Sequence, residues 1–279
     1  MSKSSIQRIA AFSLGEMGGN PAGVLLADRL PAAEEMQRIA AEVGYSETVF
    51  VAPEGKASRI RYFAPEAEVP FCGHATIALG AALGAAYGAG RHELILNHAR
   101  IDVTASEDAM GWRAELTSPG TKHRAVEASL LGDALAHFGW TESDLDPALP
   151  PARINGGTEH LLLALSRQAL LQKMSYDFDT GAALMRASGL GTINLVWRET
   201  AARFHARNAF AGHGVYEDPA TGAAAAALAG YLRDTGKQDQ PFTILQGADM
   251  GAPSELRVTP LPGRGAPVRV AGHTRRLAA

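Results

Sequence analysis

The chain of 279 residues contains a single cysteine and little else that marks a specialised class of protein. One cysteine excludes an internal disulfide framework and is typical of a reducing compartment, so we expect a cytoplasmic protein. The 26 basic and 29 acidic residues leave a net charge of −3, which favours neither nucleic acid nor an anionic membrane as a partner. The most apolar run, residues 222–232, is too short to span a bilayer. The first residues lack an apolar stretch, so no signal peptide is expected.

Motifs for metals and cofactors are lacking as well. The nine histidines show no metal-ligand spacing; His92 and His98, for example, are six residues apart, and no Cys/His cluster is visible in the sequence. No phosphate loop or dinucleotide fingerprint follows an expected strand. We therefore predict that the protein needs no cofactor and no metal.

A repeated segment is the main positive signal. Seven residues recur in one register 149 positions later: Glu68, Pro70, Gly73, Ala75, Ala78, Leu79 and Leu83 match Glu217, Pro219, Gly222, Ala224, Ala227, Leu228 and Leu232. In each copy an acidic residue and a proline end an extended run, a glycine turns the chain, and an Ala/Leu run follows at helical spacing. The pattern predicts two related halves, each with a long helix that begins just after its turn.

The starts of these helices have a chemical consequence. A helix N-terminus exposes unpaired backbone N–H groups and the positive end of the helix dipole, so it attracts anions. If the turns at Gly73 and Gly222 face one cleft, they form a pocket for a carboxylate. We therefore expect a small-molecule carboxylate as the substrate, bound between the two halves.

The apolar patterns predict an α+β fold in which each half has many strands. Small residues on all sides of each long helix indicate that a curved sheet or barrel wraps around it. We expect one half over residues 1–118, with the C-terminal strand 266–279 as a candidate addition to it. The other half covers residues 125–265, and residues 118–124 form the linker.

Three side chains stand out as candidates for catalysis. Glu47 lies between a helix-ending glycine and an apolar strand, and its plain alternative is a solvated loop carboxylate. His74 lies in the first turn of its helix, where a neutral imidazole is favoured over its cation, although a lone histidine is more often structural. Asp218 lies at the second turn, where an aspartate also serves as a helix cap.

Several segments resemble the phenazine-biosynthesis isomerase-like (PhzF-like) family. Its three signature segments match residues 46–50 (SETVF), 68–76 (EVPFCGHAT) and 217–223 (EDPATGA), and residues 19–23 and 246–251 also fit. The resemblance covers nearly the whole chain. It implies the fold of diaminopimelate epimerase, which has two pseudo-symmetric domains, each a sheet around a central helix. It also implies a homodimer.

The resemblance also implies roles for individual residues. Glu47 would be the general acid/base, while His74 and Asp218 would line the substrate pocket and support proton transfer. Substrate-binding groups would be Ser46, beside the acid, and the backbone N–H groups of Gly73, Gly222 and their neighbours. Ala223 stands where the family commonly has serine.

The sequence predicts a cofactor-independent isomerase that moves a proton on a small carboxylate-bearing metabolite. Cyclic, amino-acid-like compounds belong to this class of substrate. Two alternatives remain open. One is an amino-acid racemase, epimerase or lyase that uses Cys72, since racemases of this fold have a cysteine before each turn glycine; here the second is Thr221. The other is a non-catalytic binding protein on the same scaffold. The comparable strand in the second half begins at residues 191–194, and no acid there matches Glu47. The absence of a second acid favours proton transfer by one base over stereo-inversion.

Overall fold

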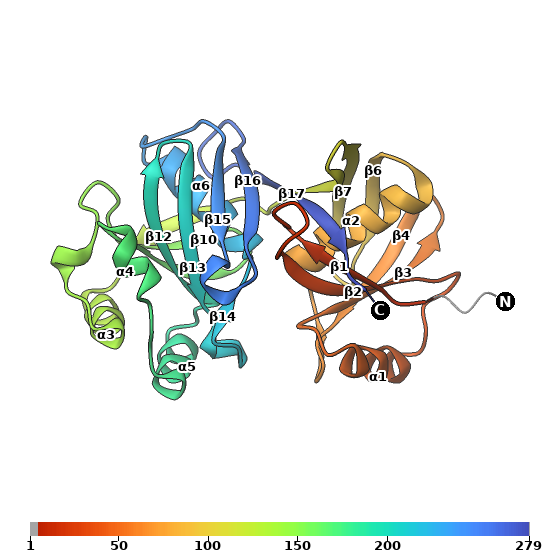
Figure 1. Ribbon diagram of the computed structural model, residues 1–279, viewed down its shortest axis with the longest axis horizontal. Helices are drawn as coiled ribbons and strands as arrows, with labels where there is room; N and C mark the ends of the chain where they lie inside the picture. Colours follow the sequence, from red (N-terminus) through yellow and green to blue (C-terminus); the bar gives the residue numbers. More distant parts are fainter. Residues whose placement is uncertain (1–4, 279) are drawn as a thin grey trace. The chain divides into compact units, whose positions relative to one another are not determined.

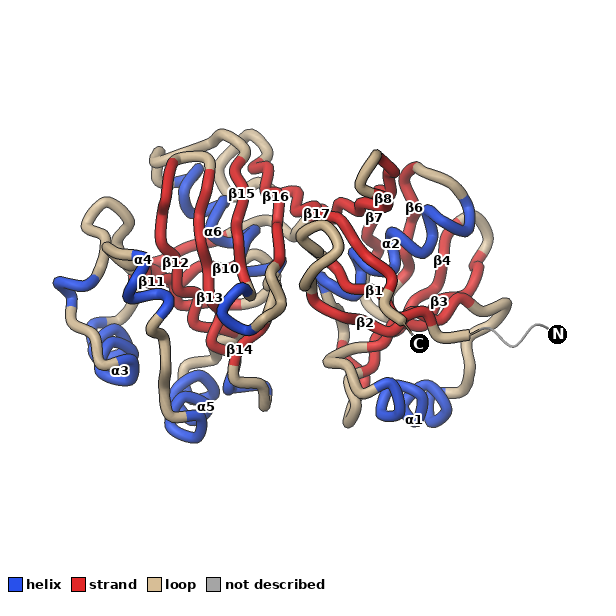
Figure 2. Tube along the Cα trace, in the orientation of Figure 1, coloured by secondary structure: helices blue, strands red, loops and turns tan. Residues whose placement is uncertain are grey.

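The structure is a computed structural model that describes residues 5–278, and it divides into two compact units. Unit 1 comprises the chain up to Thr117 and again from Ala271, and unit 2 comprises Ser118–Val270. Figure 1 shows the course of the chain and Figure 2 its helices and strands. Residues 1–4 lie outside the described residues; they belong to the segment from which we expected no signal peptide. Residue 279, the last of the expected strand 266–279, also lies outside them.

Unit 1 is a closed barrel of eight strands around one helix. The strands follow the hydrogen-bonded ring β1–β2–β3–β4–β6–β7–β8–β17, and β17 closes the ring on β1. The elements are β1 (Gln7–Ala11), β2 (Asn20–Leu26), α1 (Ala33–Val43), β3 (Thr48–Glu54), β4 (Ala57–Phe63), β5 (Glu68–Val69), α2 (Gly73–Tyr87), β6 (Gly90–Ile95), β7 (Arg100–Asp108), β8 (Gly111–Thr117) and β17 (Val268–Arg276). Helix α1 packs outside the barrel on β3 and β4.

Helix α2 forms the core of unit 1, and its residues are buried without a break from His74 to Gly84. Such a helix needs small residues, because the barrel wall approaches it from all sides. A side chain at Gly80 would place its Cβ 2.6 Å from Val103 of β7, and one at Gly84 would collide with the ring of Trp112 in β8. The glycines therefore set how closely the helix fits its barrel.

Unit 2 repeats this plan with the helix α6 against its sheet. Its strands pair in the order β9–β10–β11–β12–β13–β15–β16, with β14 on β13. The elements are β9 (Lys122–Ala125), α3 (Ala128–Phe138), η1 (Glu142–Asp144), β10 (Ala152–Asn155), β11 (Glu159–Ala164), α4 (Gln168–Gln172), α5 (Phe178–Ala187), β12 (Thr192–Thr200), β13 (Arg203–Ala209), η2 (Ala211–His213), β14 (Glu217–Asp218), α6 (Gly222–Asp234), β15 (Phe242–Gln246), η3 (Ala248–Met250) and β16 (Ser254–Pro260). Helices α3 and α5 pack on the outside with a separate apolar cluster beneath them.

The two units match element by element. In both, a parallel pair (β2–β3, β11–β12) leads through an antiparallel strand (β4, β13) to a two-residue strand (β5, β14) and then to the central helix. The short strands begin at Glu68 and Glu217 and the helices at Gly73 and Gly222, so the repeat of the sequence is a repeat of the structure. The predicted α+β fold of two pseudo-symmetric domains is confirmed.

The expected linker at residues 118–124 is wrong in its second half. Lys122–Ala125 form β9, which pairs antiparallel with β10. The Ser-Pro-Gly sequence at its start is typical of a loop, and nothing local marks the strand, because its hydrogen-bonding partner lies about 30 residues further on. In residues 5–278, no helix is long and apolar enough to cross a membrane.

A buried histidine in unit 2 predicts a pH dependence of stability. Burial lowers the pKa of His160 to about 4, against the usual value of 6.5, although the charge of Glu159 opposes the shift. His160 Nδ1 pairs with Thr192 Oγ1 at 2.8 Å, and that hydroxyl donates to Asn208. As pH falls from about 6.5 to 4, the unfolded chain gains a proton that native His160 does not, so the folded state loses stability.

The side-chain amide of His160→Asn can replace Nδ1 but does not titrate. We therefore expect the free energy of unfolding of this variant to fall less steeply with decreasing pH. Between pH 7.5 and 4.5 the wild type should lose about 2 kcal/mol more of its free energy of unfolding than the variant. Urea unfolding at several pH values measures the difference, with the exposed His213→Asn as control. Parallel pH profiles of wild type and His160→Asn would contradict this prediction.

Candidate active site

The candidate site residues of unit 1 lie where β3 begins and at the N-terminus of α2. The backbone of Glu47 is held at the barrel rim because its carbonyl accepts a hydrogen bond from the Gly23 amide of β2, at 3.1 Å. The next residue, Thr48, starts β3, and its side chain is fully buried. The strand pairing therefore fixes the direction in which Glu47 leaves the rim.

Glu47, His74 and Cys72 gather at this rim. Glu47 Oε2 lies 3.4 Å from His74 Nε2, and Ser46 Oγ lies at the same distance from that nitrogen. Cys72 Sγ lies 3.3 Å from His74 Nδ1. Glu47 Oε2 is shielded from solvent and has no hydrogen-bond partner among the described residues. A carboxylate oxygen that is desolvated and uncommitted is well suited to take a proton.

A buried hydrogen-bond chain supports the turn behind these side chains. Tyr62 Oη and Thr76 Oγ1 are 2.6 Å apart, and Thr76 donates to the carbonyl of Cys72 at 2.7 Å. Burial raises the pKa of Tyr62, so the phenol keeps its proton. The chain ties the first turn of α2 to strand β4 and thereby limits the movement of Cys72 and His74.

In unit 2, the candidate site residue Asp218 lies at the turn before α6. Thr221 donates its hydroxyl to Asp218 Oδ2 at 2.5 Å, just before α6 begins. Gln246, at the end of β15, donates to the Asp218 carbonyl at 2.6 Å and accepts from the Thr221 amide at 3.3 Å. The sequence predicted no role for Gln246; its one signal was its place at the start of the segment 246–251.

The equivalent positions in the two units differ in chemistry. Where unit 1 has Glu47 before β3, unit 2 has Gly191 before β12, and where α2 has His74, α6 has Ala223. Gly191 leaves no room for a side chain, because a Cβ there would collide with Thr158. At these matching positions the carboxylate and the imidazole therefore occur in unit 1 alone, whereas a glycine, Gly73 or Gly222, opens the helix in both units.

A forked ion pair that the sequence did not predict precedes each helix. Arg61 of β4 bonds Glu68 through Nε and Nη2, at 2.7 and 2.6 Å. Arg207 of β13 bonds Glu217 in the same way, at 2.9 and 2.5 Å. The two glutamates are members of the repeat, but the arginines lie three residues out of its register and gave no signal. Each pair joins a long strand to the short strand that leads into the turn.

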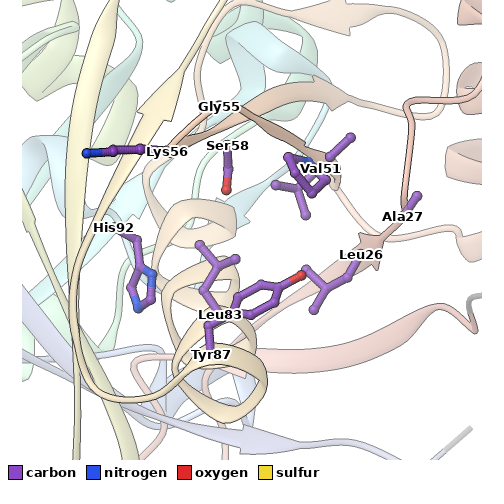
Figure 3. Close-up of a pocket in the computed structure, with 11 residues that line it drawn as sticks. Leu26, Ala27, Val51, Gly55, Lys56, Ser58, Leu83, Tyr87 and His92 are labelled. Carbon is purple, nitrogen blue, oxygen red and sulfur yellow. The ribbon is translucent and has the colours of Figure 1, made fainter.

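A cavity of ≈ 280 Å³ lies at the other end of α2 from His74. Leu83 and Tyr87 from α2, with His92 and Lys56, are among the side chains that surround it (Figure 3). Neither Glu47 nor His74 lines it. We therefore place the candidate chemistry at the rim near Glu47 rather than in this cavity.

Comparison with known proteins decides the family. A family model described as phenazine biosynthesis-like protein matches residues 9–277. The chain belongs to this family. It is 34% identical over 260 residues to an uncharacterized isomerase of Deinococcus radiodurans, a match that covers 90% of this chain and 84% of that protein. It is 32% identical over 253 residues to the trans-2,3-dihydro-3-hydroxyanthranilate isomerase of Pseudomonas fluorescens, covering 88% and 86%.

The fold agrees with this membership. A crystal structure of the Bacillus anthracis phenazine biosynthesis protein of the PhzF family superposes with a TM-score of 0.85 at 23% identity, and the match covers 100% of this chain and 98% of that one. The phenazine biosynthesis-like family consists of isomerases and epimerases, and this chain is an enzyme of that class. Membership in a family of enzymes contradicts the alternative of a non-catalytic binding protein.

Proposed function

We propose that this protein is a cofactor-independent isomerase that moves a proton on a small carboxylate-bearing metabolite. The observation that supports this most is the shielded oxygen Glu47 Oε2, 3.4 Å from His74 Nε2. At the positions that match Glu47 and His74, unit 2 has Gly191 and Ala223, so this pair is not repeated there. Inversion of a stereocentre by two bases needs proton-transferring groups on both faces of a carbon, whereas one base suffices to move a proton along a conjugated system.

The proposed reaction conserves protons and electrons. The Glu47 carboxylate removes a proton from an activated carbon, and the electron pair of the broken C–H bond moves into the conjugated system. The protonated acid then delivers the proton to another carbon of that system. His74 holds Glu47 and the substrate in position. Because no electrons leave the substrate, the reaction needs no oxidant or reductant.

We further propose that the two helix N-termini bind the substrate carboxylate and stabilise the carbanion-like state. The amides of Gly73, Gly222 and Ala223 lie in the first turn of their helices, where backbone N–H groups have no partner within the helix. Asp218, held by Thr221 and Gln246, would support proton transfer on the same substrate. Ser46, whose hydroxyl approaches His74, completes the proposed set.

The substrate class follows from the relatives. A family member at 32% identity is named for its action on trans-2,3-dihydro-3-hydroxyanthranilate, a cyclic amino acid with conjugated double bonds. We propose a substrate of the same chemical class for this enzyme. To test the assignment, the purified protein is dialysed against chelator. It is then incubated with a panel of cyclic β,γ-unsaturated amino acids and, separately, with that compound.

Running the panel in deuterium oxide makes the test specific. Formation of an isomer with or without deuterium at the new carbon supports the proposal, since the label reports only whether the proton exchanges with solvent before it is returned. A requirement for added metal, nicotinamide, flavin or pyridoxal phosphate would contradict it. Inversion at one carbon without a shift of the double bond would indicate the racemase alternative.

A cysteine variant separates the two enzyme classes. We expect Cys72→Ala to retain most of the turnover, within about threefold, because Thr221 replaces the second thiol that a two-thiol mechanism needs. Steady-state kinetics on the substrate identified above measure this, with thermal melting as a check on folding. Loss of turnover in a folded Cys72→Ala protein would move the assignment to a racemase or lyase.

We also propose a homodimeric, cytoplasmic enzyme. The support is the family membership together with a composition that has one cysteine and nearly balanced charge. Light scattering after size-exclusion chromatography determines the mass in solution.

A further inference from the structure

Glu47, Cys72 and His74 together form a donor set that the spacing of the sequence did not reveal. One ligand atom from each lies within 4.8 Å of the others. His74 Nε2 is 3.4 Å from Glu47 Oε2 and 3.9 Å from Cys72 Sγ. In a tetrahedral zinc site with bonds of about 2.0–2.3 Å, neighbouring ligand atoms are about 3.3–3.6 Å apart. The three donors therefore lie close to the separations that one zinc ion requires.

We propose that this cluster binds Zn²⁺ through Cys72 Sγ, His74 Nε2 and Glu47 Oε2 and leaves a fourth position open. A thiolate, an imidazole and a carboxylate are the three kinds of ligand that Zn²⁺ takes in proteins, whereas Mg²⁺ and Ca²⁺ prefer oxygen alone. Copper(II), nickel(II) and cobalt(II) bind the same kinds of ligand, so these metals could occupy the site as well. We propose Zn²⁺ as the ion that the protein binds.

The surroundings favour an ion at this place. Cys72 and His74 are each only 8% exposed, so little water competes for their donor atoms. Glu47 Oε2 is shielded and has no hydrogen-bond partner among the residues of the described range, and a cation would satisfy it. Cys72 Sγ lies 3.3 Å from Nδ1 as well as 3.9 Å from Nε2, so the thiol sits beside the ring.

The zinc site would regulate the enzyme rather than serve the reaction. An ion bound by Glu47 and His74 occupies the carboxylate oxygen and the nitrogen that the proposed isomerase uses. Zinc would therefore inhibit reversibly, and this consequence, unlike the binding itself, rests on the proposed function. The expectation that catalysis needs no metal is unchanged.

Titration with Co²⁺ tests the binding without any substrate. The chain has one cysteine, so a thiolate-to-cobalt charge-transfer band in the near ultraviolet can come only from Cys72. We expect this band to rise to one equivalent of Co²⁺, to be accompanied by intense visible bands of four-coordinate cobalt, and to disappear when one equivalent of Zn²⁺ is added. Absence of the thiolate band in the wild-type protein at stoichiometric Co²⁺ overturns the proposal.

Variants identify the other ligands. Loss of a residue that only hydrogen-bonds to a metal ligand costs about 10–100-fold in metal affinity. Loss of a ligand itself should cost at least as much, so Cys72→Ser, His74→Gln and Glu47→Gln should each weaken Zn²⁺ binding by this factor or more in calorimetry. The matched control is His205→Gln, which removes an imidazole 3.0 Å from a carboxylate, Glu199, where no thiol is present; it should bind as the wild type does. Equal affinity in wild type and Cys72→Ser overturns the proposal even if metal binds elsewhere.

Inhibition is measured separately on the wild-type protein alone. Equimolar Zn²⁺ should reduce isomerisation in deuterium oxide at least tenfold, and chelator should restore it. A thiolate–cobalt spectrum without inhibition keeps the metal site and contradicts the role of Glu47 in the reaction. Inhibition without that spectrum contradicts the site while leaving the isomerase proposal in place.

Discussion

Glu47→Gln should reduce turnover by about 10³-fold or more, equivalent to roughly 4 kcal/mol of transition-state stabilisation. The amide has nearly the shape of the carboxylate but cannot accept a proton from carbon. Oε2 lies 3.4 Å from His74 Nε2 and has no other partner in the described part of the chain, so substitution leaves the packing unchanged. The measurement is kcat for isomerisation, together with wash-in of deuterium from solvent.

The matched control is Glu42→Gln, at an exposed acid near the end of α1 that pairs with Arg38. It should keep full turnover. His74→Gln should fall in between, with a loss of about 10–100-fold, because the imidazole positions Glu47 but does not take the proton in the proposed reaction. A folded Glu47→Gln protein with turnover within tenfold of the wild type would place the base elsewhere.

Arg207→Met should destabilise the protein by about 3–5 kcal/mol, the largest effect on stability that we expect. The side chains of Arg207 and Glu217 are 9% and 2% exposed, and Arg207 Nη1 also donates to three backbone carbonyls, among them that of Leu171 at 3.3 Å. Loss of the guanidinium leaves a buried carboxylate without its cation. Urea unfolding measures the change, and the melting temperature should fall by about 10 °C.

The repeat provides the control for this substitution. Arg61→Met removes the same fork from unit 1, where the side chains of Arg61 and Glu68 are 24% and 28% exposed. Solvent there compensates the remaining charge, so the loss should be about 1 kcal/mol or less. The double variant Arg207→Met/Glu217→Met should be more stable than Arg207→Met alone, because no unpaired charge remains. Equal losses for Arg207→Met and Arg61→Met would show that burial does not set the cost.

The candidate site was predictable only in part. Glu47, His74 and Asp218 could be selected because each lies beside a turn that the sequence marks with proline or glycine, and the family segments include all three. The contact between Glu47 and His74 could not be derived from their positions 27 residues apart, because it depends on how β3 and α2 meet at the barrel rim. For the same reason the spacing of the histidines did not predict the cluster of Glu47, Cys72 and His74. The hydrogen bonds between Gln246 and Thr221 could not be predicted either.

The turns, the long helices and the doubling of the fold could be predicted from the sequence. These features depend on local chemistry: proline and glycine restrict the backbone over a few residues, and an uninterrupted run of small residues forms a helix that only a surrounding sheet can bury. The partners of Arg61 and Arg207, the His160 hydrogen bonds and the strand at Lys122–Ala125 could be seen only in the three-dimensional structure. Each of these depends on strands brought together by pairing over many residues, and the register of such pairing is set by the packing of the whole barrel rather than by the residues that it joins.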